Sequence, residues 1–193
     1  MPYSFPPDLK IALTGDLGSG KSTVARRLCQ LTGFEYFSTG LIQRQLAEDL
    51  GVDTLTLNRM AEVDPTIDHR IDSAIQALRH ASGQYVIDSR LAWFFIPEAY
   101  KVYLTVEVRV AAERILNDKD RSSEHYADLE DAIKRLTARK ASENARYLRL
   151  YGADCSDLSR FDLVLDTTHR TIDEVCDRIL LSISAAYPDA KGH

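Results

Sequence analysis

Cysteines, long apolar runs and clustered histidines are all scarce in this chain of 193 residues. The three cysteines, Cys29, Cys155 and Cys176, are widely spaced, which argues against a disulfide framework and favours a reducing compartment. The five histidines show no metal-ligand spacing, so a zinc site is not expected. The longest apolar run, Leu91–Ile96, has six residues, whereas a helix needs about 20 to cross a bilayer. These scarcities exclude a disulfide scaffold and a helical membrane protein.

The chain also has no excess of basic residues. It carries 24 Lys and Arg against 29 Asp and Glu, a formal charge of −5. This balance argues against a protein whose main role is to coat nucleic acid. Residues 1–8 contain three prolines and no apolar run, so they do not resemble a signal peptide. We therefore expect a cytoplasmic protein without a membrane or nucleic-acid partner.

Apolar runs alternate with helical patterns along the chain, which predicts an α/β fold. A hydrophobic share of 45% suffices for one core, and without repeats or linkers we expect residues 1–193 to form a single domain. Such alternation predicts a five-stranded parallel sheet with helices on both faces. The expected strands are Leu9–Thr14, Phe34–Phe37, Tyr85–Asp88, Val102–Thr105 and Leu163–Asp166. The expected helices are Ser22–Leu31, Thr39–Leu50, Leu55–Ala81 broken at Pro65, a helical region over Val106–Tyr151, and Ile172–Tyr187.

A glycine-rich turn between the first strand and the first helix is the strongest signal. Residues 15–23 read GDLGSGKST and satisfy the P-loop pattern G-x-x-x-x-G-K-[ST]. Glycines let backbone N–H groups surround an anion, and the helix N-terminus adds partial positive charge. We expect Lys21 to reach the outer phosphates of ATP and Ser22 to ligate Mg²⁺. The residues predicted to bind ATP are Gly15, Asp16, Gly18, Ser19, Gly20, Lys21, Ser22 and Thr23.

A P-loop does not specify the group that receives the phosphoryl, so the acceptor site needs its own evidence. Ser38, Thr39 and Gly40 begin an expected helix, and Arg44 follows in its second turn. A helix N-terminus beside a guanidinium is a plausible cradle for a second phosphate. An ordinary N-cap with a solvated arginine is an equally good interpretation from sequence alone.

Two further segments carry charged residues suited to phosphoryl transfer. Asp88 ends a central strand, where it can hold a metal-bound water or orient the attacking oxygen, and Arg90 follows it. The alternative is that Asp88 only caps a turn. Arg139, Glu143 and Arg146 share one helical face, which is either an exposed salt bridge or part of a mobile lid. A lid would bring arginines onto developing charge and exclude water.

With these motifs in place, the chain resembles the cytidylate kinases, a branch of the nucleoside monophosphate kinases, in their short archaeal-type form. The likeness runs from Lys10 to about Leu181. It implies that the P-loop binds ATP, that Ser38, Gly40 and Arg44 contact the monophosphate, and that Asp88 and Arg90 contact the nucleotide. It also implies an acceptor-binding insertion over about residues 38–82, which includes residues 61–68, and a lid over about residues 115–150 that closes through Arg139, Glu143 and Arg146.

Two positions depart from the pattern of the resemblance. Ser89 stands where the family has glycine, and Leu91 stands where many bacterial members carry an aspartate that recognises the acceptor. Both departures concern base and sugar specificity more than phosphoryl transfer.

The expected activity is therefore transfer of a phosphoryl group from Mg·ATP to a nucleoside monophosphate, CMP or dCMP before others. In this hypothesis Lys21, Asp88, Arg139 and Arg146 are catalytic, and Ser22 and Asp88 hold the metal. Ser38, Gly40, Arg44, Arg90 and Glu143 bind the acceptor, and the enzyme is a monomer or weak homodimer. The alternatives are a kinase for another small acceptor, such as dephospho-coenzyme A or a sugar-like alcohol, and a nucleotide-binding regulator without turnover.

Overall fold

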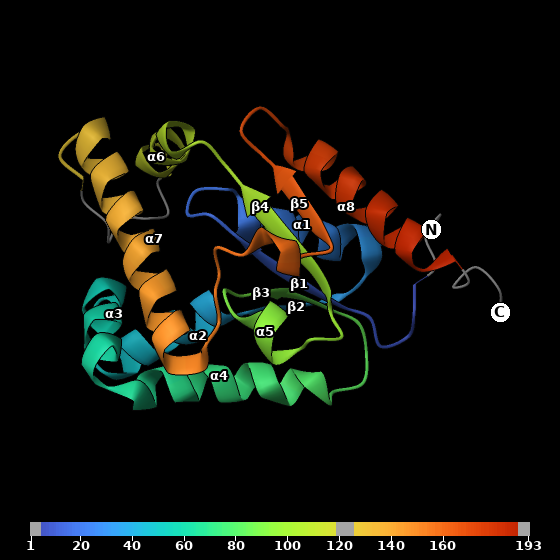
Figure 1. Cartoon of the computed structure of the whole chain (residues 1–193), viewed down its shortest axis with the longest axis horizontal. Helices are drawn as coiled ribbons and strands as arrows, with labels where there is room; N and C mark the ends of the chain where they lie inside the picture. Colours follow the sequence, from blue (N-terminus) through green and yellow to red (C-terminus); the bar gives the residue numbers. More distant parts are fainter. Residues whose placement is uncertain (1–4, 119–125, 189–193) are drawn as a thin grey trace.

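Five parallel strands form one central sheet in the computed structural model, which describes residues 5–118 and 126–188 apart from the side chains at positions 54, 55, 62 and 65 (Figure 1). The strand order is β2-β3-β1-β4-β5. The strands are β1 (Lys10–Gly15), β2 (Glu35–Ser38), β3 (Tyr85–Asp88), β4 (Tyr100–Thr105) and β5 (Leu163–Asp166). Because β1 lies at the centre, the turn that follows it opens at the middle of the carboxyl edge of the sheet.

Helices cover both faces of the sheet. The helices are α1 (Lys21–Thr32), α2 (Thr39–Asp49), α3 (Thr54–Val63), α4 (Pro65–Arg79), α5 (Ala92–Phe95), α6 (Val108–Leu116), α7 (Leu129–Tyr151) and α8 (Ile172–Ala186), with a 3-10 turn at Leu158–Arg160. Side chains alternate along β1, so Ile11 and Leu13 pack in the cluster that contains α1 and α8, while Ala12 packs with α4 and α5 on the other face. The expected three-layer fold is confirmed.

Two smaller apolar clusters lie outside the main core and support the segments that surround the site. Leu46, Leu57 and Ile71 are members of a cluster that joins α2, α3 and α4. Ala112, Ile115, Leu136 and their neighbours join α6 to α7. In Figure 1 both groups of helices lie on the same side of the molecule, with α7 extending toward α3 and α4. The lid predicted for residues 115–150 contains residues 119–125, which lie outside the described residues.

Most local predictions hold, but the helical region expected over Val106–Tyr151 divides into α6 and α7, and the described residues between them, 117–118 and 126–128, are not helical. Asp64 ends α3 and accepts a hydrogen bond from Thr66 N at 2.9 Å, which starts α4 beside Pro65. The apolar run Leu91–Ile96 contains the short helix α5. Trp93 there is 7% exposed and contacts Phe161 with ring centroids 5.3 Å apart. Trp93 and Phe95 therefore pack into the core that contains α4 and α5, whereas Phe94 is 36% exposed.

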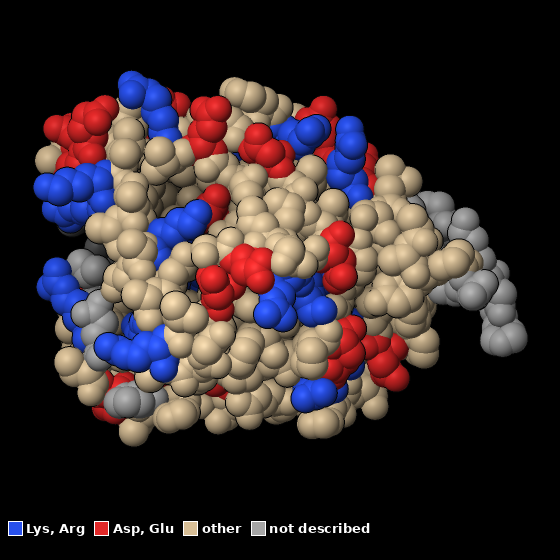
Figure 2. Space-filling model, viewed as in Figure 1, with Lys and Arg blue, Asp and Glu red and all other residues tan. Residues whose placement is uncertain are grey.

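The molecular surface reflects the similar numbers of basic and acidic residues in the sequence. Basic and acidic side chains lie interspersed on the face drawn in Figure 2. Within the described residues, no helix combines the length and the apolar character that crossing a membrane requires.

Candidate active site

The turn between β1 and α1 presents the uncapped start of a helix. Gly20 occupies the N-cap position with φ +82°, and no side chain caps the first turn of α1. A left-handed backbone at this position favours glycine. Gly18 is left-handed too, with φ +77°, and in addition a Cβ there would lie 2.7 Å from the Ala111 Cβ on α6. The N–H groups at the start of α1 therefore remain available to an anion such as a phosphate.

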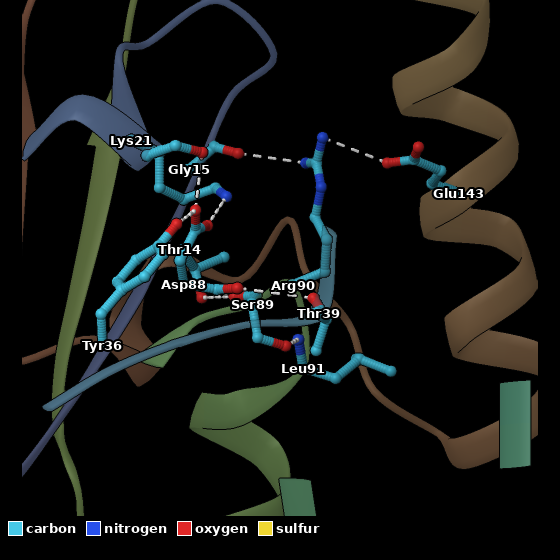
Figure 3. A network of polar contacts seen from close by, with 11 residues as sticks. Thr14, Gly15, Lys21, Tyr36, Thr39, Asp88, Ser89, Arg90, Leu91 and Glu143 are labelled. Carbon is cyan, nitrogen blue, oxygen red and sulfur yellow. Dashed lines mark hydrogen bonds and ion pairs between the residues drawn. The ribbon is translucent and has the colours of Figure 1, made fainter. Parts of the chain in front are cut away.

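Asp88 lies at the centre of a polar network beside this turn (Figure 3). Its carboxylate forms an ion pair with Lys21 and accepts hydrogen bonds from Ser22 Oγ at 2.6 Å and Tyr36 OH at 3.1 Å. Burial works to raise the pKa of Asp88, but the charge of Lys21 and these hydrogen bonds outweigh it and lower the pKa. Asp88 is therefore a buried anion held beside the P-loop lysine.

Arg90 connects the P-loop to α7. Its Nη1 donates to the Gly15 carbonyl at 3.0 Å, and its Nη2 lies 3.2 Å from Glu143 Oε2 (Figure 3). Arg139 Nε donates to the other oxygen of Glu143 at 2.9 Å. Burial favours neutral Glu143, but Arg90 and Arg139 outweigh it and lower the pKa of Glu143. The Glu143 carboxylate thus holds the guanidinium groups of Arg90 and Arg139 close to each other.

A cavity of about 250 Å³ brings together all five residues predicted to bind the acceptor. Its lining includes the catalytic candidates Lys21, Asp88 and Arg139, the metal candidate Ser22, and the acceptor candidates Ser38, Gly40, Arg44, Arg90 and Glu143. Arg44 makes no ion pair with another described residue. Several cationic and hydroxyl-bearing groups therefore face one space that a phosphate can enter.

A second cavity, of about 710 Å³, lies along the other side of the P-loop. All eight residues predicted to bind ATP except Gly15 line it, and Arg44 and Arg90 line it too. Arg114, Thr167 and Arg170 complete its wall and were missed by the sequence reasoning. Arg114 Nη2 donates to the Thr167 carbonyl at 2.7 Å, which joins α6 to the end of β5. Thr167 directly follows β5, and a polar residue at that strand end was the available signal.

The side chain of Asp16 contacts protein groups in this structure. Its Oδ1 accepts from Tyr103 OH at 2.9 Å, and its Oδ2 accepts from Val106 N at 3.3 Å. Lys140 Nζ on α7 lies 2.6 Å from the same Oδ1. Neither Tyr103 nor Lys140 was predicted as a site residue, because only the fold brings β4 and α7 to the P-loop.

Arg146 lies apart from the phosphate-facing residues. It is 7% exposed, its Nε lies 3.6 Å from Asp68 Oδ2, and its Nη1 donates to the Asn58 carbonyl at 3.4 Å. It belongs to the lining of neither cavity described above. Its predicted catalytic role stays a prediction, and its contacts indicate that it positions Asp68.

The two departures from the resemblance have clear local roles. Ser89 is 2% exposed, and its Oγ accepts a hydrogen bond from Leu91 N at 3.2 Å. It thereby stabilises the turn that presents Arg90. Leu91 is 3% exposed and belongs to the core that contains α4 and α5, so it contributes an apolar wall to the smaller cavity.

The residues present also suit a magnesium ion held with a nucleotide. Ser22 and Asp88 supply neighbouring oxygen atoms, which is the chemistry that Mg²⁺ prefers. Among the described residues no group of three or more His, Cys, Asp or Glu could enclose a metal. In the usual magnesium site one or two carboxylates act together with substrate phosphates.

The fold and the P-loop define the chain as a P-loop protein with a three-layer α/β fold. Over 89% of this chain, the fold matches the shikimate kinase of Bacteroides thetaiotaomicron with a TM-score of 0.61, covering 96% of that chain at 11% sequence identity. The profile of the cytidylate kinase-like family matches residues 10–169. The cytidylate kinase of Sulfolobus acidocaldarius is 38% identical over 91% of this chain and 94% of its own length. That of Pyrobaculum aerophilum is 36% identical over 85% of this chain and 86% of its own length. The chain belongs to the cytidylate kinase-like family.

Proposed function

We propose that this chain transfers the γ-phosphoryl group of ATP to a nucleoside monophosphate, CMP or dCMP before others. The observation that carries the proposal is the shared cavity, in which the P-loop pair Lys21 and Ser22 faces Arg44, Arg90 and Arg139. A phosphate held by the P-loop and a phosphate held by the arginines would meet there. The family relationship to cytidylate kinases supports the choice of acceptor.

The reaction requires the protein mainly to position the two substrates and to neutralise their charge. An anionic oxygen of the acceptor monophosphate attacks the γ-phosphorus, and the bond from that phosphorus to the bridging oxygen of ADP breaks. The attacking oxygen is already ionised near neutral pH, so no strong general base is needed. Positioning and charge neutralisation then supply the rate enhancement. This fits a site built from lysine and arginines.

Each residue has a defined task in this proposal. Lys21 leaves Asp88 to contact the β- and γ-phosphates, while Arg44 and Arg90 bind the acceptor phosphate. Arg139 neutralises charge that develops during transfer. Ser22 and Asp88 would hold the magnesium ion, which supplies charge neutralisation at the phosphates. The segment α2 to α4 provides the acceptor side, and α6 with α7 forms the lid.

The test is a coupled assay of ADP release with Mg·ATP and a panel of CMP, dCMP, UMP, AMP and GMP. We expect rapid turnover with CMP or dCMP and much slower turnover with the purine monophosphates. Absence of turnover across the panel, with ATP still bound, would overturn the proposed acceptor class. A further set containing shikimate and dephospho-coenzyme A would then identify a different acceptor.

A further inference from the structure

One wall of the smaller cavity carries carboxylates rather than cations. Asp68 and Asp72 lie one turn apart on α4, and both line the cavity that Lys21 and Arg90 also line. Each is 5% exposed. Two carboxylates repel a phosphate, so this wall needs a different part of the ligand.

One oxygen of the buried Asp68 carboxylate lacks a hydrogen bond to any described residue. Its Oδ2 has no hydrogen-bond partner among the described residues. Its ion-pair partner, Arg146 Nε, lies 3.6 Å away. That nitrogen likewise has no hydrogen-bond partner among the residues that the structure describes. A buried polar atom without a partner is costly, so its persistence beside a cavity points to a ligand that donates a hydrogen bond.

Asp72 and the apolar neighbours define the shape of this end of the cavity. Tyr151 donates a hydrogen bond to Asp72, which fixes that carboxyl against α7. Ile71, Ile75 and Tyr147 line the same space and are all buried. Leu91 adds a further apolar surface and no polar group. A flat ring fits between such walls, with its donor group directed at Asp68.

We infer that Asp68 recognises the acceptor base by accepting a hydrogen bond from the exocyclic amino group of cytosine. The inference rests on the proposed function, since the arginine side of the cavity must hold the monophosphate. Cytosine presents an amino donor at the ring position where uracil presents a carbonyl oxygen. The carboxylate attracts the donor and repels the carbonyl, and the ion pair with Arg146 holds Asp68 in place. Burial raises the pKa of Asp68, and the charge of Arg146 opposes part of that shift.

The experiment combines a change in the protein with the matching change in the ligand. Initial rates are measured for the wild type and for Asp68→Asn with CMP, UMP and the monophosphate of 2-pyrimidinone riboside, which lacks the amino group. With CMP we expect Asp68→Asn to lower kcat/KM about ten- to hundredfold, the loss typical of a hydrogen bond to a charged group. With the pyrimidinone nucleotide we expect little change, and the preference for CMP over UMP should fall because the amide of the variant can donate to the uracil carbonyl.

Arg70→Gln is the matched control, because Arg70 is exposed on the same helix. We expect it to leave all three substrates unaffected. Equal losses with CMP and the pyrimidinone nucleotide would show that Asp68 only supports the fold, and would overturn the inference while the proposed function stands. Equal kcat/KM of the wild type for CMP and for the pyrimidinone nucleotide would overturn the inference without any variant. Absence of turnover by the wild type with every nucleotide would overturn both this inference and the proposed function.

Discussion

Lys140 Nζ on α7 lies 2.6 Å from Asp16 Oδ1 in the P-loop. The pair joins two segments that are far apart in the sequence, and Tyr103 donates to the same oxygen at 2.9 Å. The side chain of Lys140 is 44% exposed, so solvent screens the attraction. The contact therefore holds α7 near the P-loop with a modest free energy, on the order of that of other exposed ion pairs.

Substitution Lys140→Gln should loosen the lid without unfolding the protein. An exposed ion pair contributes roughly 0.2–1 kcal/mol, so we expect kcat/KM for ATP to fall by no more than about fivefold. Amide hydrogen exchange in α7 should become faster. Lys134→Gln, at an exposed position of the same helix, is the control. Unchanged exchange in α7 would show that the ion pair does not restrain the lid.

Lys21→Met should remove turnover and also destabilise the fold. Loss of a positioned donor in phosphoryl transfer costs on the order of a hundredfold or more in kcat. The buried Asp88 carboxylate would lose its ion-pair partner, which destabilises a protein by roughly 3–5 kcal/mol in fully buried cases. Ser22 and Tyr36 still donate to Asp88, so we expect a smaller loss.

A double variant separates these two effects. Lys21→Met with Asp88→Asn removes the unpaired charge, so its free energy of unfolding should recover toward the wild-type value while turnover stays absent. Urea unfolding and the ADP-release assay measure the two quantities. Near-normal turnover in Lys21→Met would contradict the P-loop mechanism.

Arg90→Lys should impair the acceptor site although the charge is kept. Arg90 contacts the Gly15 carbonyl with one nitrogen and Glu143 with another. A lysine has one compact ammonium group and cannot reproduce that planar, forked geometry. We expect KM for CMP to rise about tenfold or more, with a smaller effect on KM for ATP. Equal increases in KM for CMP and for ATP would show that Arg90 supports the structure of the whole site and does not bind the acceptor specifically.

Asp72 should make the stability of the fold depend on pH. Burial raises its pKa to about 6, and the hydrogen bond from Tyr151 opposes only part of that shift. A raised pKa favours the protonated folded state, so the contribution of Asp72 to stability is full below about pH 4 and is lost as pH rises to 6. Asp72→Asn should remove this loss and stabilise the fold at pH 7.5 by up to about 3 kcal/mol.

Urea unfolding of both proteins between pH 4 and pH 8 measures this difference. The advantage of Asp72→Asn should grow between pH 4 and pH 6 and then stay constant, because the amide oxygen can still accept from Tyr151. Asp177→Asn, on the exposed face of α8, is the control. A constant difference between wild type and Asp72→Asn over the whole range would contradict the raised pKa.

Local sequence patterns were sufficient for the strands, the P-loop and the break at Pro65, because each depends on neighbouring residues. Ser38, Gly40 and Arg44 were found in the same way, as a helix start followed by an arginine, and they do line the cavity. The Arg139–Glu143 contact follows from helical spacing alone. Arg146 shows the limit of that reasoning, because helical spacing cannot tell which neighbouring element a side chain faces.

By itself the sequence determined the order of strands and helices, the phosphate-binding turn and the candidate arginines, since these depend on short-range periodicity and on the few residues that suit a tight turn. Only the tertiary structure decided which distant residues share a cavity. The approach of α4 and α7 to the end of β3 buries Asp68 and Asp72 opposite Arg90. The packing of α6 against α7 and Leu17 brings Arg114 to the P-loop, where it donates to the Gly18 carbonyl at 3.4 Å. The physical reason is that burial of apolar faces on α4, α6 and α7 positions these polar side chains, and such long-range packing leaves no local pattern around the charged residues themselves.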